Sequence, residues 1–292
     1  MSRPIPVEQM VKEFKSRHTT SHLSKIDNFS LLKKHNVKMV ESSVFTLGGY
    51  KWKLIVYPNG KNDNGYVSIF LVNQVSVNAK LQFHLFVISQ LRQTWQSSGT
   101  MDFGISSTSQ TRGALNLTPV ADLRKNGYLI EDCCILGVEF YRIGNPKSGT
   151  AECLSLIEKP HNHRVTWKMT RFSSFEPEKI HFSDDFIVGS RRWRIKVHPR
   201  KDKPFSVYLS GEEFINNVPR TNTFAKFKLR VLDQVKRKHL EKTYSGWIGA
   251  EPDESHGFAD FMPFKSLDTP FLVKDHFYVG VDFELISITK LL

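Results

Sequence analysis

Apolar and polar residues alternate in short runs along most of this chain. Such alternation predicts β-strands with one buried and one exposed face, and the runs are separated by glycine, proline, asparagine and serine. The clearest predicted strands cover residues 52–57, 66–71, 81–87 and 134–141. No strand-helix-strand rhythm accompanies them. The pattern therefore favours an all-β fold of antiparallel sandwiches with few short helices.

Three short segments carry helical signals. Residues 7–15 place apolar side chains at helical spacing, which predicts a small N-terminal appendage. Residues 120–125 and 263–267 each begin at or after a proline, which is favoured in the first turn of a helix. We expect these helices to be minor additions to the strands.

The strand pattern occurs twice. Phe45, Gly48, Trp52, Val56 and Pro58 recur 141 residues later as Phe186, Gly189, Trp193, Val197 and Pro199. This period exceeds the roughly 20–50 residues of solenoid and propeller repeats, so each copy is expected to be a domain with its own core. The expected division is an N-terminal extension over 1–21, a first domain over 22–144, a linker over 145–162 and a second domain over 163–292.

The composition fits two soluble domains. Hydrophobic residues make up 40% and aromatic residues 12% of the 292 residues, which is enough for two ordinary cores. No run approaches the ~18 apolar residues of a membrane span, and residues 1–18 lack the apolar stretch of a signal peptide. The expected location is the cytoplasm or the nucleus. The three cysteines lack a disulfide-framework spacing, so we expect reduced thiols.

The net charge of +12 raises the question of nucleic-acid binding. The excess is spread over both halves, and two clusters stand above it, at residues 191–194 and 236–239. The arginines around Trp193 are expected on the solvent-exposed face of a strand. The second cluster, residues 236–239, could attract phosphates. A solvated surface is the simpler interpretation of both clusters. A basic protein that binds nucleic acid or an anionic surface is the alternative function.

Motifs of catalysis and cofactor binding are absent from the sequence. It contains no glycine-rich phosphate loop, no HExxH or CxxC arrangement and no nucleophile elbow. The nearest grouping of metal ligands is Cys153, His161 and His163, which lacks a fourth ligand, so a solvated linker is the simpler interpretation. We therefore expect no enzyme activity, no cofactor and no metal.

The spaced residues of both copies carry a family resemblance. The first copy contains Phe29-Ser30, Phe45-x2-Gly48-x-Tyr50-Lys51-Trp52-x3-Val56-Tyr57-Pro58, Ser68-Ile69-Phe70-Leu71 and Asp132. The second contains Phe172-Ser173, Phe186-x-Val188-Gly189, Trp193-x3-Val197-His198-Pro199 and Asp275. Over about residues 22–144 and 163–290 the chain resembles the MATH domain, also called the meprin and TRAF homology domain. Its tandem arrangement is similar to that of plant TRAF-like proteins.

The resemblance implies sandwiches of seven or eight strands that bind extended peptide segments of partner proteins at a sheet edge and a shallow groove. It implies a non-catalytic adaptor in ubiquitin-linked or trafficking pathways. The matching groove turns are taken as residues 102–105 in the first copy and 255–258 in the second. The implied peptide-binding positions are Phe70, Phe83, Trp95, Phe103 and Ile105, then Tyr208, Phe227, Trp247 and Phe258.

Several of these positions have a core alternative. Phe70, Phe83, Tyr208 and Phe227 alternate on predicted strands, where an aromatic residue is more often buried. Trp95 and Trp247 lie among polar neighbours, so we expect them to be partly exposed, as binding hot spots are. The turns also depart from the family pattern, with His256 in place of tryptophan and Ile105 in place of phenylalanine. The specificity of relatives therefore cannot be transferred.

Overall fold

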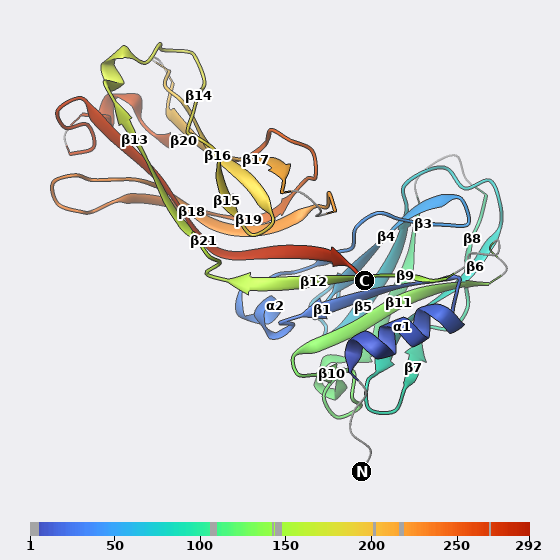
Figure 1. Cartoon of the computed structure of the whole chain (residues 1–292). Helices are drawn as coiled ribbons and strands as arrows, with labels where there is room; N and C mark the ends of the chain where they lie inside the picture. The colour runs from blue at the N-terminus through green and yellow to red at the C-terminus, as the bar shows by residue number, and fades with distance from the viewer. Residues whose placement is uncertain are drawn as a thin grey trace. The chain divides into compact units, whose positions relative to one another are not determined.

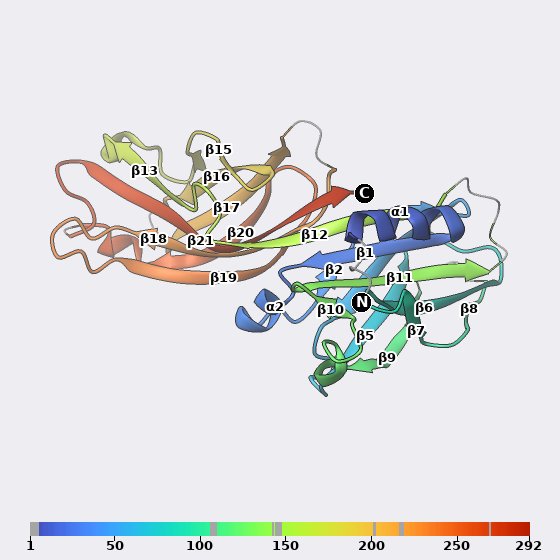
Figure 2. The ribbon, with the colours of Figure 1, turned by 60° about the horizontal axis from the view of Figure 1, so that its bottom comes forward.

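The computed structural model describes residues 6–105, 110–141, 143, 148–200, 203–215, 219–268 and 270–292. The chain divides into two compact units, unit 1 with Met1–Leu156 and Thr289–Leu292, and unit 2 with Ile157–Ile288. Figures 1 and 2 show that strands dominate both units. The predicted all-β fold is confirmed, and the repeat corresponds to two sandwiches.

Unit 1 is built from two sheets. Its strands are β1 (Ser21–Asp27), β2 (Val40–Glu41), β3 (Phe45–Leu47), β4 (Tyr50–Tyr57), β5 (Tyr66–Asn73), β6 (Leu81–Ser89), β7 (Thr94–Ser97), β8 (Met101–Phe103), β9 (Thr111–Pro119), β10 (Leu129–Ile130), β11 (Cys133–Tyr141) and β12 (Thr150–Glu158). One sheet has the order β12-β1-β11-β6-β7, and the other has the order β2-β4-β5-β9. The helices are α1 (Val7–Arg17), α2 (Ser30–Lys34) and the 3-10 turn η1 (Val120–Asp122).

Unit 2 repeats this plan. Its strands are β13 (Arg164–Thr170), β14 (His181–Phe182), β15 (Phe186–Val188), β16 (Arg191–His198), β17 (Phe205–Phe214), β18 (Thr223–Val231), β19 (Leu240–Ile248), β20 (Glu254–Met262) and β21 (His276–Leu291). One sheet contains β19-β18-β21 with β13 beside β21, and the other has the order β14-β16-β17-β20. Two 3-10 turns, η2 (Phe172–Ser174) and η3 (Phe264–Ser266), complete the unit.

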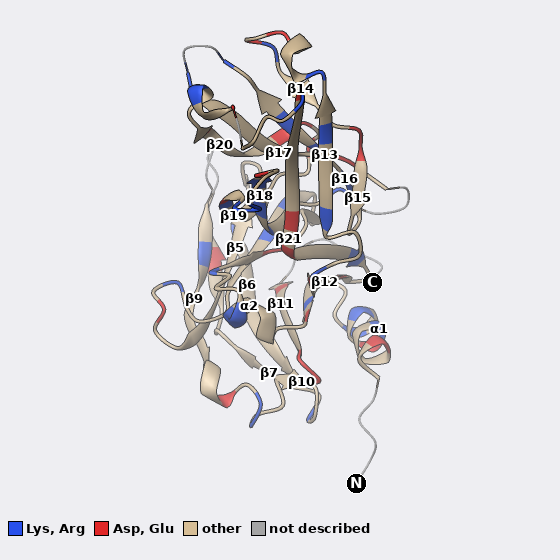
Figure 3. Ribbon diagram, turned by 90° about the vertical axis from the view of Figure 1, so that its left-hand side faces the viewer, with Lys and Arg blue, Asp and Glu red and all other residues tan. Residues whose placement is uncertain are grey.

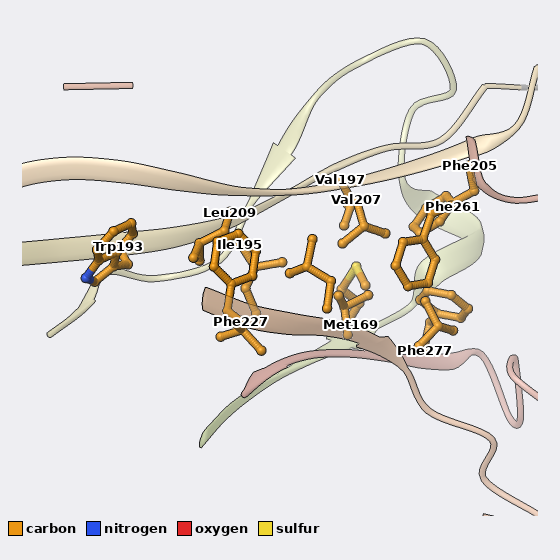
Figure 4. Close-up of a cluster of buried hydrophobic side chains, with 14 of the residues drawn as sticks. Met169, Trp193, Ile195, Val197, Phe205, Val207, Leu209, Phe227, Phe261 and Phe277 are labelled. Carbon is orange, nitrogen blue, oxygen red and sulfur yellow. The ribbon is translucent and has the colours of Figure 1, made fainter. Parts of the chain in front are cut away.

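The tryptophans of the repeat have the same role in both units. Trp52 and Trp193 are fully buried, and each indole N–H donates to a backbone carbonyl five residues earlier, at 3.1 Å. In unit 2, Trp193, Leu209 and Phe227 lie within one cluster of buried side chains (Figure 4). Burial on alternate positions of β4 and β16 follows the predicted period of two. The repeated tryptophans therefore mark equivalent core positions of the two units.

The structure differs from the sequence-based expectation at both ends of unit 1. Helix α1 is more than an appendage, because Met10 and Val11 are buried with Leu23 of β1 and Phe86 of β6. Residues 150–158, expected to be linker, form β12 and pair in parallel with β1. A parallel neighbour distant in sequence gives no local signal, which explains why the sequence pattern does not predict this strand.

Among the described residues, no helix is long and apolar enough to cross a membrane.

The basic residues are distributed over strands and loops of each unit (Figure 3). The expectation that the arginines around Trp193 all face water is wrong for Arg191, which is fully buried. Arg191 lies two residues before Trp193 and so shares its inward face, whereas Arg192 is exposed. The cluster Lys236 to Lys238 is exposed in the loop after β18, where the Asp233 carboxylate accepts backbone N–H bonds from that loop.

The three cysteines are free and buried in unit 1. Burial raises the pKa of Cys133 to about 12 and that of Cys153 to about 11, and the thiol of Cys153 donates to Asp27 at 3.1 Å. These thiols are held protonated and are poor nucleophiles. Among the described residues, no group of three or more His, Cys, Asp or Glu side chains is placed to hold a metal ion.

The buried His22 predicts a dependence of unit 1 stability on pH. Its ring stacks on Phe45 with centroids 3.8 Å apart, and burial, together with the charge of Lys15, lowers its pKa from 6.5 to about 3. Between these values the unfolded chain binds a proton that the folded chain does not. The free energy of unfolding should therefore fall as pH falls, by about 1.4 kcal/mol per pH unit.

Urea unfolding of the wild type and of His22→Gln between about pH 7 and pH 4 measures this effect. The wild type should lose more stability than the variant as pH falls, because only the wild type carries the titrating ring. Equal pH slopes for the two proteins would show that His22 does not titrate differently in the folded and unfolded states.

Candidate functional site

Each sandwich has one edge strand that follows the same design. Among the described residues, β9 pairs with β5 alone and β20 pairs with β17 alone. An edge strand presents backbone N–H and C=O groups to which another extended segment can pair. Other strands, β2 and β7 in unit 1 and β14 and β19 in unit 2, also lie at sheet edges, but β9 and β20 are the pair of edges that share the features described next.

A glycine marks the same point of each edge strand. Gly113 of β9 lies opposite Phe70, and Gly257 of β20 lies opposite Tyr208. A Cβ atom at Gly113 would lie 2.4 Å from the carbonyl oxygen of Ile69, and one at Gly257 would lie 2.3 Å from that of Val207. Such distances are too short for any side chain. Each edge strand therefore requires glycine at this position.

A bulge follows the glycine in both units. The pairing register shifts between Val67 and Ile69 in unit 1 and between Phe205 and Val207 in unit 2. A buried serine hydroxyl donates to the carbonyl oxygen two residues after each glycine, Ser68 to Leu115 at 2.5 Å and Ser206 to Ala259 at 2.7 Å. Bulges re-aim side chains and are frequent next to functional sites. The same contacts in both units establish that Gly113 and Gly257 are counterparts.

The outward face beside the edge of unit 1 is apolar. Ile55, Phe70 and Gly113 stand in register across β4, β5 and β9. The half-buried ring of Phe70 meets Tyr57 edge-on with centroids 5.7 Å apart, and the ammonium of Lys61 lies 5.2 Å from the ring. This row forms a shallow aromatic floor next to the free backbone of β9.

The same face of unit 2 is cationic and aromatic. Lys196, Tyr208 and Gly257 form the equivalent row across β16, β17 and β20. The ring of Phe182 on β14 lies 5.6 Å from the ammonium of Lys196 and 5.8 Å from the guanidinium of Arg194. In unit 1 the position of Phe182 holds Glu41, which pairs with Lys53 at 2.7 Å. We call the row of Lys196, Tyr208 and Gly257 the floor of unit 2. It is cationic and aromatic, whereas the floor of unit 1 is apolar.

The residues that flank each glycine also differ. In unit 2, His256 has both ring nitrogens engaged, at 2.6 Å from the Tyr244 hydroxyl and 2.9 Å from the Glu254 carboxylate. Burial alone would raise the pKa of Glu254, but hydrogen bonds from the Gly249 N–H and from His256 outweigh it and lower that pKa. In unit 1 the corresponding flanking residues are Arg112 and Ala114. The two edges therefore present different side chains to a ligand.

Arg191 fixes the loop that leads into β20. Its guanidinium donates to the carbonyl oxygens of Gly249 at 2.6 Å and Glu251 at 2.8 Å. It also donates to the carbonyl oxygens of Glu212 at 2.8 Å and Gly211 at 3.1 Å. Buried polar groups are satisfied in this way when they hold irregular backbone in place. Arg191 is thus a positioning residue for the β20 edge.

The predicted site residues fall into three groups. Phe83, Phe103 and Phe227 are fully buried, so their assignment to a groove is corrected. For Phe83 and Phe227 the core alternative applies, whereas no core alternative was expected for Phe103. Phe70, Tyr208 and Phe258 are half-buried and lie on or next to the edge strands. Ile105 is 73% exposed but follows β8, which pairs with β6 and not with the β9 edge.

The two tryptophans are not equivalent. Trp95 is 40% exposed, pairs with Ile88 and has its ring centroid 5.9 Å from that of Phe14 in α1. Trp247 is half-buried and pairs with Phe224. Neither residue lies on β9 or β20. The partial exposure expected for both is observed, but they do not mark one shared groove.

The expected groove turn of the first copy is also corrected. Residues 102–105 were matched with 255–258, but the counterpart of the Gly257 segment is Arg112-Gly113-Ala114. Residues 90–110 between β6 and β9 are nearly equal in number to residues 232–253 between β18 and β20, so the 144-residue offset from Phe83 to Phe227 also relates Gly113 to Gly257. The match to residues 102–105 placed the turn about nine residues too early. The pairing of Ser68 with a carbonyl of β9 is the signal that identifies the correct position.

Comparisons with known proteins agree with this architecture. A family model described as the MATH domain matches residues 21–140 and 164–283. Ubiquitin C-terminal hydrolase 13 of Arabidopsis thaliana is 30% identical over 125 residues, which cover 40% of this chain and 11% of that protein. A MATH domain and coiled-coil domain-containing protein of the same plant is 26% identical over 136 residues, 44% of this chain and 45% of that protein. The matches thus cover less than half the length of either relative.

Among solved structures, TRAF5 of Notothenia coriiceps superposes with a TM-score of 0.37 and 20% sequence identity. The superposition covers 48% of this chain and 80% of the TRAF5 chain.

Proposed function

Because this chain belongs to the MATH domain family, whose members are protein-interaction modules, we propose that it is a non-catalytic adaptor with two peptide-binding edges. Unit 1 binds an extended segment of a partner protein along β9, and unit 2 binds one along β20. The observation that carries this proposal is the shared glycine and bulge of the two edge strands.

The binding mode follows from the backbone of the edge strands. An added peptide strand pairs with edge N–H and C=O groups of β9 and β20, which supplies affinity without side-chain specificity. Two carbonyls are already engaged, that of Leu117 by Gln96 and that of Asp260 by Lys242, both at 2.6 Å. Alternate side chains of the peptide then contact the aromatic floor, Phe70 in unit 1 and Tyr208 in unit 2. The glycine keeps the strand close to that floor.

The pathway is a further part of the proposal. One relative is named a ubiquitin C-terminal hydrolase, although the match covers only 11% of it. We extend the proposal to recruitment of partner proteins into ubiquitin-linked or trafficking pathways, in the cytoplasm or the nucleus. Any chemical step would then belong to a protein that this chain recruits.

Valine at either glycine should abolish binding at that edge. Peptides selected from a random display library on the full chain are measured against Gly113→Val and Gly257→Val. Each substitution forces backbone to move, so affinity at its own edge should fall at least about tenfold, or about 1.4 kcal/mol. Peptides specific for the other edge should bind unchanged, and the urea unfolding transition of the substituted unit, measured in parallel, shows whether that unit remains folded.

Gly104→Val is the matched control. A Cβ at Gly104 meets no atom within 4 Å, and Gly104 belongs to the turn that the sequence first suggested as the groove. This variant should bind normally. If Gly104→Val lost binding while Gly113→Val kept it, the peptide would bind at residues 102–105 and the assignment to β9 would be wrong.

A further inference from the structure

Unit 1 contains a pocket that is separate from its edge strand. The pocket has a volume of about 230 Å³ and lies where α2, the turn after β4 and η1 meet. Its floor is made by the buried side chains of Leu32, Leu123 and Leu129. The exposed Lys33 and Arg124 stand at its rim, and of the described residues that line it none is acidic. No lining residue belongs to β9.

The walls of the pocket are fixed by a contact that both units share. The Asp132 carboxylate accepts bonds from the Ser30 backbone N–H at 3.0 Å and the Ser30 hydroxyl at 2.6 Å. In unit 2, Asp275 makes the same pair of bonds to Ser173, both at 2.8 Å. The pocket is therefore built on a preorganised part of the fold.

One wall position is smaller in unit 1 than in unit 2. Val120 opens η1 directly after Pro119, and Phe264 opens η3 directly after Pro263. Each then accepts a bond at its carbonyl oxygen from a leucine N–H three residues later. Phe264 packs against the core of unit 2, whereas Val120 lines the open pocket. A phenylalanine ring at this end of the sandwich is therefore compatible with the fold.

The size and charge of the pocket define what fits it. A cavity of about 150 Å³ holds a benzene ring, and drug-sized ligands occupy about 300–1,000 Å³, so this pocket matches a single aromatic side chain. The basic rim favours negative charge on either side of that ring. We propose that the pocket binds a phenylalanine side chain carried by an acidic segment of a partner protein. It is a second docking point of unit 1, beyond the β9 edge.

Methyl NMR of the full chain tests this proposal with the peptide Glu-Asp-Phe-Asp-Glu. The methyl signals of Leu32, Leu123 and Leu129 should shift on titration. Replacing the phenylalanine of the peptide with alanine should abolish the shifts, and this arm does not depend on the folding of any variant. If the leucine methyl signals stay unchanged with the phenylalanine peptide, the proposal is wrong.

Variants of the chain separate the two parts of the proposal. Val120→Phe, which introduces the residue that unit 2 carries at Phe264, should fill the pocket and weaken the peptide at least tenfold. Lys33→Glu with Arg124→Glu should weaken it about tenfold, since both exposed ion pairs with the acidic segment are lost. Lys125→Glu, a neighbouring exposed charge outside the lining, should change affinity little.

Two further ligands are tested in the same NMR titration, an uncharged peptide and benzoate. Equal affinity for Gln-Asn-Phe-Asn-Gln would overturn the requirement for an acidic segment. Benzoate that binds the same methyl groups as strongly as the peptide would identify a small molecule as the occupant and overturn the proposal. A peptide selected for the β9 edge should not compete with this peptide, so failure of the β9 edge and failure of the pocket can be distinguished.

Discussion

Arg191→Met should lower the free energy of unfolding of unit 2 by about 3–5 kcal/mol. The methionine fills much of the space but donates no hydrogen bond, so four carbonyl oxygens lose their partner, those of Gly211, Glu212, Gly249 and Glu251. The bonds to Glu212 and Gly211 are buried, where each unsatisfied group costs about 1–3 kcal/mol, whereas water can replace the donor at the partly exposed carbonyls of Gly249 and Glu251. The loop before β20 should also loosen, which weakens peptides bound to that edge.

Urea unfolding followed by tryptophan fluorescence measures the loss, with Arg192→Met as the matched control. Arg192 is the next residue along β16 and is exposed, so its substitution should change stability by less than about 0.5 kcal/mol. A loss below about 1 kcal/mol for Arg191→Met would mean that the guanidinium is not needed to hold this loop.

Trp52→Ala and Trp193→Ala should each destabilise one unit by about 3–5 kcal/mol. Both indoles are fully buried, so truncation leaves a large cavity and an unpaired carbonyl oxygen at Leu47 or Val188. Because each unit has its own core, Trp52→Ala should lower the melting transition of unit 1, and Trp193→Ala should lower that of unit 2.

Scanning calorimetry of the full chain separates the two transitions. Trp95→Ala serves as the control, since 40% of this residue is exposed and its truncation should cost clearly less. If either core variant lowered both transitions equally, the two units would unfold as one, and the inference of two independent domains from the repeat would fail.

The sandwich architecture could be predicted from the sequence because apolar and polar residues alternate along its strands with a period of two. Trp52, Leu54 and Val56 face inward while the residues between them face out, and the same period governs β16. The buried Arg191 could have been found by the same rule, since it is two positions from Trp193. Because arginine is charged, we expected it on the exposed face, although the period of two places Arg191 on the buried face.

The binding edge of unit 1 could not be placed in this way. The pairing of Gly113 with Phe70, on a strand about forty residues earlier, is not specified by any local pattern, although the 144-residue offset from Phe83 to Phe227 relates Gly113 to Gly257. The family resemblance implies groove positions at Phe83 and Phe103, but both side chains point inward and are completely buried. The proposed location along β9 rests on the pairing of strands in the structure.

The comparison of the two units also suggests how their partners differ. Around the edge of unit 1 the floor is formed by Ile55 and Phe70, with Arg112 beside the glycine. Around the edge of unit 2 the corresponding residues are Lys196, Tyr208 and His256. A peptide selected by one edge should therefore compete poorly for the other. The duplication retained the scaffold and the edge while the contact residues diverged.

Hydrogen exchange of the full chain with and without a selected peptide tests the central claim most directly. A peptide that adds to a sheet edge buries backbone N–H groups of that strand, which slows their exchange. We predict that protection on binding is concentrated in residues 111–119 or 254–262. Protection confined to other segments, with the exchange of both edge strands unchanged, would contradict the account.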